Sequence, residues 1–110
     1  MPRLYREWGG LWWGKGEIGT INASWPFARL SAFPTQVEIR VLFPLAWRRF
    51  VLKRGEVRLI HKQRGLWSTG VRFEHNSAAA PGFLLFWTFA PDTLLRRLGE
   101  LGYPVPSDSS

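Results

Sequence analysis

Cysteine is absent from the 110 residues, which excludes a disulfide framework, a thiolate metal site and a cysteine nucleophile. A chain of this size without cysteine suits a reducing compartment. No apolar run approaches the roughly 18 to 20 residues that span a bilayer, and the first residues contain no apolar stretch typical of a secretory signal. These absences predict a cytoplasmic protein, and they leave peripheral attachment to a membrane open.

Groups suited to catalysis or metal binding are scarce. The two histidines, His61 and His75, stand fourteen positions apart, and the eight carboxylates are spread singly along the chain. There is no Asp-x-Asp or Glu-x-x-His spacing, and no glycine loop is followed by the helix and lysine-serine pair that hold a phosphate. The sequence therefore predicts a protein that is not an enzyme and that uses no metal and no cofactor.

Short segments of alternating apolar and polar residues, separated by turn residues, fill most of the chain, which is typical of an all-β sandwich or barrel. Ser24-Trp25-Pro26 and Pro34-Thr35 are predicted turns, because proline fixes its own φ and supplies no donor to a ladder. The last segment is apolar without alternation, which favours a strand covered on both faces. Seven strands are predicted, over residues 16–23, 27–33, 36–42, 47–53, 57–64, 69–75 and 83–89.

One helix is predicted after the last strand. Pro91 suits a first helical position, and Asp92 places negative charge where the helix dipole favours it. Four leucines at positions 94, 95, 98 and 101 form one apolar stripe, and Gly102 is the expected stop. Since the helix is short, we expect it to be stabilised by packing on the sheet. Beyond it, Pro104 and residues 106–110 are predicted to fray, although Tyr103 and Val105 could dock.

Four stretches resemble small bacterial pleckstrin-homology-like (PH-like) proteins: WPFARLSAF at 25–33, GLWSTGVRFEH at 65–75, FLLFWT at 83–88 and LLRRLGELGYPV at 94–105. The resemblance implies a mainly β fold, in which a curved seven-stranded sheet or partly open barrel is capped by the C-terminal helix. It also implies a scaffold for phosphoinositide, peptide or protein binding. Residues 22–26 lack the cations of the phosphoinositide-binding pattern, and Arg29 is followed by Ser31 where that pattern has a second cation. The predicted organisation is an N-terminal segment 1–15 that packs on or extends the domain, one domain over 16–105 and a disordered tail 106–110.

The net charge of +7 is concentrated in one segment. Between positions 40 and 64 there are eight basic residues and one acid, Glu56, while the charges elsewhere cancel. If strands 47–53 and 57–64 pair, their cations form a surface that attracts anions. The alternative is a solvated outer face that maintains solubility and protects an edge strand. The candidate residues for an anionic partner are Arg48, Arg49, Lys53, Arg54, Arg58, Lys62 and Arg64.

Aromatic residues gather at the N-terminus. The chain has seven Trp, and Tyr5, Trp8, Trp12 and Trp13 lie among basic neighbours in the first fifteen positions. Such residues are favoured at membrane or partner interfaces. The alternative is that the segment folds back over an open end or edge of the sheet, with Trp8 and Trp12 on one helical face, although three glycines argue against a long helix.

These features predict a non-catalytic interaction module that binds a protein or an anionic membrane surface through a basic face centred on residues 40–64. Nucleic-acid binding by the same face is an alternative, because Trp47 and Trp67 lie near the cations and could stack on bases. A further alternative is a homo-oligomeric structural component in which the N-terminal aromatics bury against a second copy.

Overall fold

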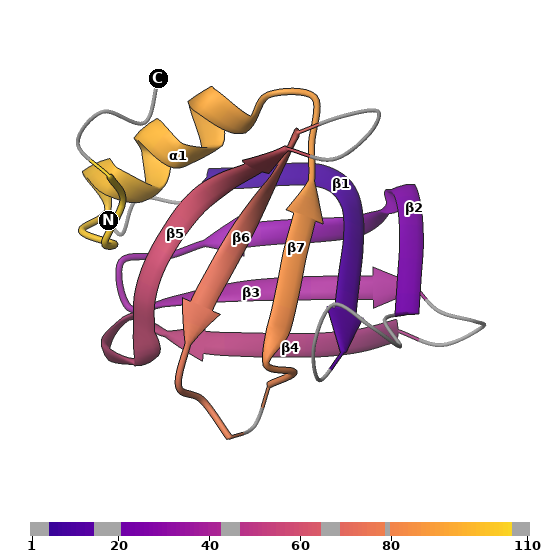
Figure 1. The fold of residues 1–110 in the computed structure, drawn as a ribbon, viewed down its shortest axis with the longest axis horizontal. Coiled ribbons are helices and arrows are strands. Elements are labelled where there is room, and N and C mark those ends of the chain that lie inside the picture. Colours follow the sequence, from indigo (N-terminus) through magenta and orange to yellow (C-terminus); the bar gives the residue numbers. More distant parts are fainter. Residues whose placement is uncertain (1–4, 15–20, 43–46, 65–68, 79, 107–110) are drawn as a thin grey trace.

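The structure is a computed structural model that describes residues 5–14, 21–42, 47–64, 69–78 and 80–106. Seven strands precede one α-helix (Figure 1). The elements are β1 (Tyr5–Gly14), β2 (Ile21–Ala32), β3 (Gln36–Leu42), β4 (Trp47–Lys53), a 3-10 turn η1 (Arg54–Glu56), β5 (Val57–Arg64), β6 (Thr69–His75), β7 (Phe83–Trp87) and α1 (Pro91–Glu100).

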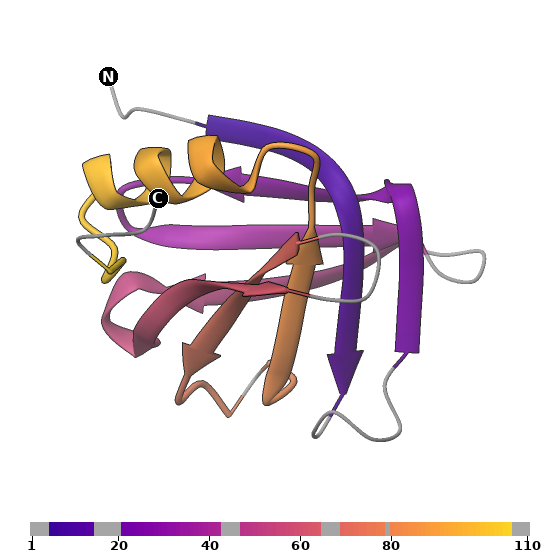
Figure 2. The ribbon, with the colours of Figure 1, turned by 45° about the horizontal axis from the view of Figure 1, so that its top comes forward.

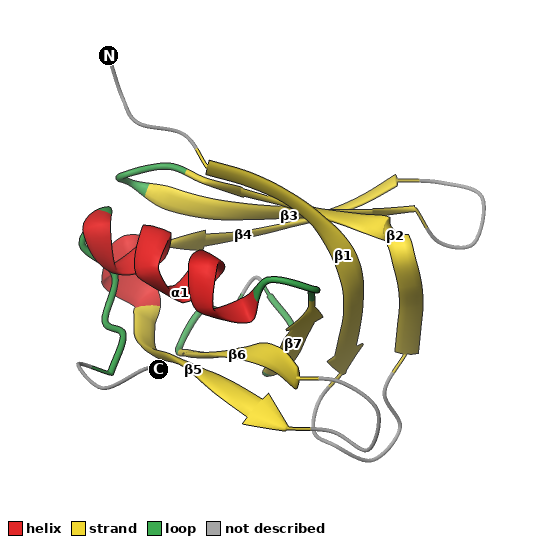
Figure 3. Ribbon diagram, turned by 90° about the horizontal axis from the view of Figure 1, so that it is seen from above, coloured by secondary structure: helices red, strands yellow, loops and turns green. Residues whose placement is uncertain are grey.

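All seven strands belong to one antiparallel sheet with the order β4-β3-β2-β1-β7-β6-β5. The sheet curves until β2, β3 and β4 face β5, β6 and β7, with β1 bending between the two halves (Figure 3). The helix α1 lies across one open end. The predicted fold class, a mainly β chain with a curved seven-stranded open sheet and one C-terminal helix, is confirmed.

The first two strands differ from the prediction. Tyr5–Gly14 forms β1, which lies in the middle of the sheet between β2 and β7, and Figure 2 shows it running from beside α1 down along β7. The prediction of two strands over 16–23 and 27–33 is wrong from residue 21 onward, because Ile21–Ala32 is one strand. Residues 16–20 of the first predicted strand lie outside the described residues.

The expected turn at Ser24-Trp25-Pro26 is a corner within β2. The register passes from Gly9 opposite Ala28 to Leu11 opposite Ala23, so β2 contains extra residues where the sheet bends. On the other strand, a Cβ added to Gly9 would lie only 2.1 Å from the carbonyl oxygen of Trp87. Glycine is therefore required where β1 lies close to the end of β7.

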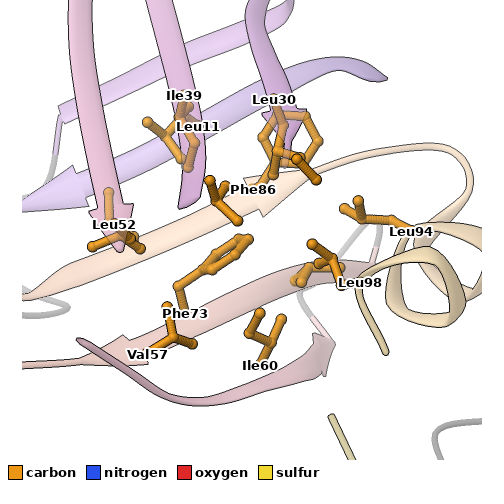
Figure 4. Close-up of a cluster of buried hydrophobic side chains, with 14 of the residues drawn as sticks. Leu11, Leu30, Ile39, Leu52, Val57, Ile60, Phe73, Phe86, Leu94 and Leu98 are labelled. Atoms are coloured by element: carbon orange, nitrogen blue, oxygen red, sulfur yellow. The ribbon is translucent and has the colours of Figure 1, made fainter. Parts of the chain in front are cut away.

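The core lies between the two halves of the sheet and α1 (Figure 4). Apolar side chains alternate inward along the strands, and three leucines of the helix close the end, as the leucine stripe predicted. Gly102 follows the helix with a φ of +97°, the left-handed conformation expected of a glycine stop. The largest fully buried side chains of this core are Leu11, Leu30, Ile39, Leu52, Ile60, Phe73, Leu84, Phe86, Leu94, Leu95 and Leu98.

The segment after the helix docks on the sheet. Tyr103 is buried, and its hydroxyl donates a hydrogen bond to the carbonyl oxygen of Phe33 at 2.5 Å. Ile60 N–H donates to the carbonyl oxygen of Pro104 at 2.9 Å, so the prediction that Pro104 frays is wrong. Residues 107–110 of the predicted tail lie outside the described residues. No helix of the described part is long and apolar enough to cross a membrane.

Candidate binding surface

The predicted basic surface depended on pairing between β4 and β5, and that pairing is wrong. The two strands lie at opposite ends of the sheet order, because the chain reverses through η1 onto the other half of the curved sheet. Arg48, Arg49 and Lys53 therefore lie on one edge strand, while Arg58, Lys62 and Arg64 lie on the other. Whether any of these residues binds a partner stays a prediction.

Two of the seven candidate cations bind the helix. Lys62 Nζ lies 2.8 Å from the Asp92 carboxylate in the first turn of α1, and Arg54 donates a 3.4 Å hydrogen bond to the carbonyl oxygen of Leu101 at its end. Both contacts connect α1 to the β5 side of the sheet. Arg58 and Arg64 are exposed, with Arg58 at an irregularity between Val57 and Leu59 in the β5 ladder.

A denser group of cations lies on the outer face of β2, β3 and β4. Arg29 of β2 is directly opposite Arg40 of β3, which is directly opposite Arg49 of β4. We call these three residues the arginine row. Arg6 and Lys53 are exposed and project from the same face by strand alternation. We call the arginine row together with Arg6 and Lys53 the basic face.

One carboxylate lies inside the basic face. Buried Glu38 accepts hydrogen bonds from Arg40 Nε at 2.8 Å and from Arg49 Nε at 2.6 Å. Burial alone would raise the pKa of Glu38, but the two hydrogen bonds and the two positive charges outweigh it and hold the pKa below its ordinary value. Glu38 is therefore ionised and orients both guanidinium groups, while it compensates only one of their charges.

The terminal guanidinium nitrogens of Arg40 and Arg49 remain available to a ligand. The side chains of Arg40 and Arg49 are 45% and 54% exposed, and within the described residues only their Nε atoms have hydrogen-bond partners. A guanidinium presents five N–H donors in a planar fork that matches a carboxylate or a phosphate. The arrangement can therefore bind anionic oxygens from above the sheet.

Trp8 continues the row onto β1. It is directly opposite Arg29, whose guanidinium carbon lies 5.5 Å from the centre of the Trp8 ring, within the range of a cation–π contact. Nearly half of the Trp8 side chain is exposed, and Phe27 of β2 is exposed to a similar extent. The outer face therefore combines apolar rings with the cations.

The predicted N-terminal aromatic cluster is divided between the two faces of β1. Trp8 and Trp12 are exposed, and Trp12 packs edge-on against Trp87 with ring centres 5.3 Å apart. Trp13 is buried in the core against Phe50, and the half-buried Tyr5 packs against that core. Strand alternation explains the division, so the four aromatics do not form one surface.

The sequence reasoning missed Arg29, Glu38 and Phe27 as members of the surface, and it counted Arg40 without selecting it. Arg40 and Glu38 alternate with three β-branched residues in the predicted strand 36–42, so their outward direction was available from the pattern. Arg29 lies outside the segment of excess charge, and only the register of β2 against β3 places it beside Arg40. Trp47 and Trp67, named for base stacking, have side chains outside the described residues.

The histidines are held by local hydrogen bonds. His61 Nε2 lies 2.6 Å from the Glu74 carboxylate. The His75 ring accepts from Ser77 N–H through Nδ1 and binds the carbonyl oxygen of Pro81 through Nε2. Among the described residues there is no group of three or more His, Asp or Glu that could hold a metal ion.

Comparisons with known proteins give one similarity of structure. No protein-family model matches the chain, and no curated protein matches its sequence. A solved structure of SsgB from Streptomyces coelicolor is similar, with a TM-score of 0.55 and 15% sequence identity, covering 94% of this chain and 92% of that one. At this identity the likeness concerns the fold alone, and the PH-like family stays a prediction.

Proposed function

We propose that this protein is a non-catalytic interaction module whose basic face binds an anionic surface of a partner protein. The observation that carries the proposal is the arginine row, which places three guanidinium groups on three neighbouring strands with one carboxylate, Glu38, between two of them. Neighbouring strands are about 4.8 Å apart. Like charges at this spacing repel one another unless an anion lies over them, so the row favours anionic groups.

A protein partner accounts for the surface better than a nucleic acid does. Arginine and exposed aromatic rings are enriched where proteins bind proteins. The outer face has both, because the exposed rings of Trp8 and Phe27 lie on the same side of the sheet as Arg40 and Arg49. Single-stranded nucleic acids bind along series of stacking rings. Among the described residues beside the arginine row, only Trp8 and Phe27 present exposed rings. Two rings are too few for such a series, so nucleic-acid binding is the second candidate.

The similarity to SsgB suggests where to look for the partner. Mutations in SsgB correlate with longitudinal cell division during sporulation of Streptomyces coelicolor. We propose cell-division proteins as the first candidate partners of this chain. Imaging of septa in a strain that lacks the protein tests this extension, and septa of normal number and orientation would contradict it.

The function is tested with two double variants of equal net charge. R40Q/R49Q removes two charges from the basic face, and R58Q/R64Q removes two exposed charges from the β5 edge. Binding of polyglutamate, anionic vesicles and a single-stranded oligonucleotide is measured by fluorescence anisotropy or co-sedimentation at low salt. We expect R40Q/R49Q to weaken polyglutamate binding about tenfold, roughly 1.4 kcal/mol, and R58Q/R64Q to weaken it less than twofold.

Each other outcome contradicts a stated part of the proposal. Equal weakening by both double variants means that net charge, and not the basic face, governs binding. A larger loss with R58Q/R64Q assigns binding to the β5 edge. If the protein binds the oligonucleotide or the vesicles more tightly than polyglutamate, the partner is a nucleic acid or a membrane and not a protein. Thermal unfolding of each variant identifies any loss of binding that comes from loss of fold.

A further inference from the structure

β4 forms one end of the sheet, and the described residues show which of its backbone groups point outward. The hydrogen bond from Arg54 N–H to the carbonyl oxygen of Thr35 continues the β3–β4 ladder by one position. In an antiparallel ladder, hydrogen-bonded and non-hydrogen-bonded pairs alternate. The residues at 48, 50 and 52 therefore bond to β3, and the backbone groups of Arg49, Val51 and Lys53 face away from the sheet.

One of these outward groups already has a partner from its own chain. Lys53 N–H donates to the carboxylate of Glu56 at 3.0 Å, so an acidic side chain occupies the position where the carbonyl oxygen of a further strand would lie. At the other end of the sheet, the C-terminal segment occupies the edge of β5 through the bond from Ile60 to Pro104. Within the described residues, the outward backbone groups of Arg49 and Val51 have no such cover.

The side chains beside this edge indicate what a further strand would contain. Arg49 and Lys53 lie on the outer face, so residues of an added strand opposite them would be acidic. Phe50 and Leu52 lie on the inner face, where Phe50 is only half-buried, so the alternate residues would be apolar and would extend the core. A second copy pairing through β4 would bring Arg48, Arg49 and Lys53 against their own like charges, which disfavours a homodimer at this edge.

We propose that the free edge of β4 binds an extended segment of a partner protein, with alternating acidic and apolar residues, as an eighth strand of the sheet. This proposal rests on the proposed function and specifies its partner. The added strand gains main-chain hydrogen bonds from Arg49 and Val51, and its acidic side chains reach the cations of the basic face. The same charges keep the edge from pairing with uncharged strands.

The first test replaces the central outward donor. Val51→Pro removes an N–H that makes no bond to β3, so the β3–β4 ladder keeps its hydrogen bonds. Val51→Ala is the matched control, because it shortens the same side chain and keeps the donor. The probe is an eight-residue peptide that alternates Glu and Val, and its binding is measured by fluorescence anisotropy. We expect V51P to bind the peptide at least tenfold more weakly and V51A to bind within about twofold of the unmodified protein.

The second test leaves the protein unchanged and therefore does not depend on the folding of V51P. Two versions of the peptide carry N-methyl groups, one on the amides of Glu and the other on the amides of Val. Alternate amides of an added strand face β4, so one methylated peptide should lose at least tenfold in affinity and the other should bind like the parent. Hydrogen exchange at Val51 N–H should slow when the parent peptide binds.

The outcomes separate this inference from the proposed function. Equal binding of both methylated peptides overturns strand addition, while the proposed function stands if R40Q/R49Q still weakens the binding of polyglutamate. If no anionic probe binds the protein, both proposals fail. If light scattering shows a homodimer and the V51P substitution dissociates it, the occupant of the edge is a second copy of the chain. That result overturns the acidic partner.

Discussion

At the scale of single residues, a close approach of two strands depends on one glycine. A Cβ on Gly9 would lie 2.1 Å from the Trp87 carbonyl oxygen and 2.7 Å from Phe86 Cζ, and the first contact is with backbone, which cannot rotate away. We expect Gly9→Ala to lower the free energy of unfolding by about 3 kcal/mol, the upper range for overpacking. Gly55→Ala is the control, since its Cβ would have no atom within 4 Å. Urea unfolding of both variants measures the difference, and similar midpoints would contradict the close approach of β1 and β7.

Two carboxyl groups of the same sheet respond to pH with opposite signs. Hydrogen bonds and charges of Arg49 and Arg40 hold the pKa of Glu38 below its ordinary value of 4.5, so its ionised form stabilises the fold above that pH and the stabilisation is lost as the pH falls through the lowered pKa. Burial raises the pKa of Glu7 above 4.5, against a hydrogen bond from the Tyr5 hydroxyl. Its ionised form therefore disfavours the fold at neutral pH, and that effect disappears as the pH falls.

We therefore expect Glu38→Gln to destabilise the protein at pH 7 by about 1.5 to 3 kcal/mol, the range for lost charged hydrogen bonds, with a smaller effect below about pH 4.5. Glu7→Gln should stabilise it at pH 7, and this gain should vanish near pH 4.5. Urea unfolding across pH 3 to 7 checks both signs. A destabilised E7Q at neutral pH would show that the Tyr5 hydrogen bond outweighs the cost of burying the charge.

At the scale of elements, α1 contributes to the fold through its apolar stripe. Leu98 is fully buried against the sheet, while Arg96 is exposed on the other side of the helix. We expect Leu98→Ala to cost about 3 kcal/mol, because it leaves a cavity between the two halves of the sheet, and Arg96→Ala to cost less than about 0.5 kcal/mol. Thermal unfolding followed by circular dichroism compares the two variants, and equal effects would contradict the packed helix.

At the scale of the whole molecule, the charge that is continuous in sequence is divided in space. Arg49 and Lys53 of β4 join Arg29 and Arg40 on the basic face, and the cations of β5 lie at the other end of the sheet order. We expect polyglutamate binding to weaken about fivefold between 50 and 200 mM NaCl, because salt screens exposed charges beyond about 10 Å. The R40Q/R49Q variant should have a shallower salt dependence. An unchanged slope would indicate that other charges bind the anion.

The residues differ in how far sequence alone predicted them. Pro91, Asp92 and the leucine stripe predicted α1 and its buried face, because these signals are local. The N-terminal strand was missed because it contains Gly9, Gly10 and Gly14, and glycine has low strand propensity. The strand is formed by pairing with β7, which follows some seventy positions later in the chain. The corner in β2 was predicted as a turn because proline is rare inside strands, and Pro26 lies at this point.

By itself, the sequence determined the mainly β class, the single C-terminal helix and the excess of basic charge, since alternation, capping and composition are properties of neighbouring residues. The predicted number of seven strands is right only because the missed strand β1 offsets the division of β2 into two. Only the tertiary structure decided which strands are adjacent. The arginine row exists because β2, β3 and β4 pair in one register, and the free edge of β4 exists because the curved sheet keeps β4 and β5 apart. Both depend on long-range packing of apolar faces, which alternation along a single strand does not specify.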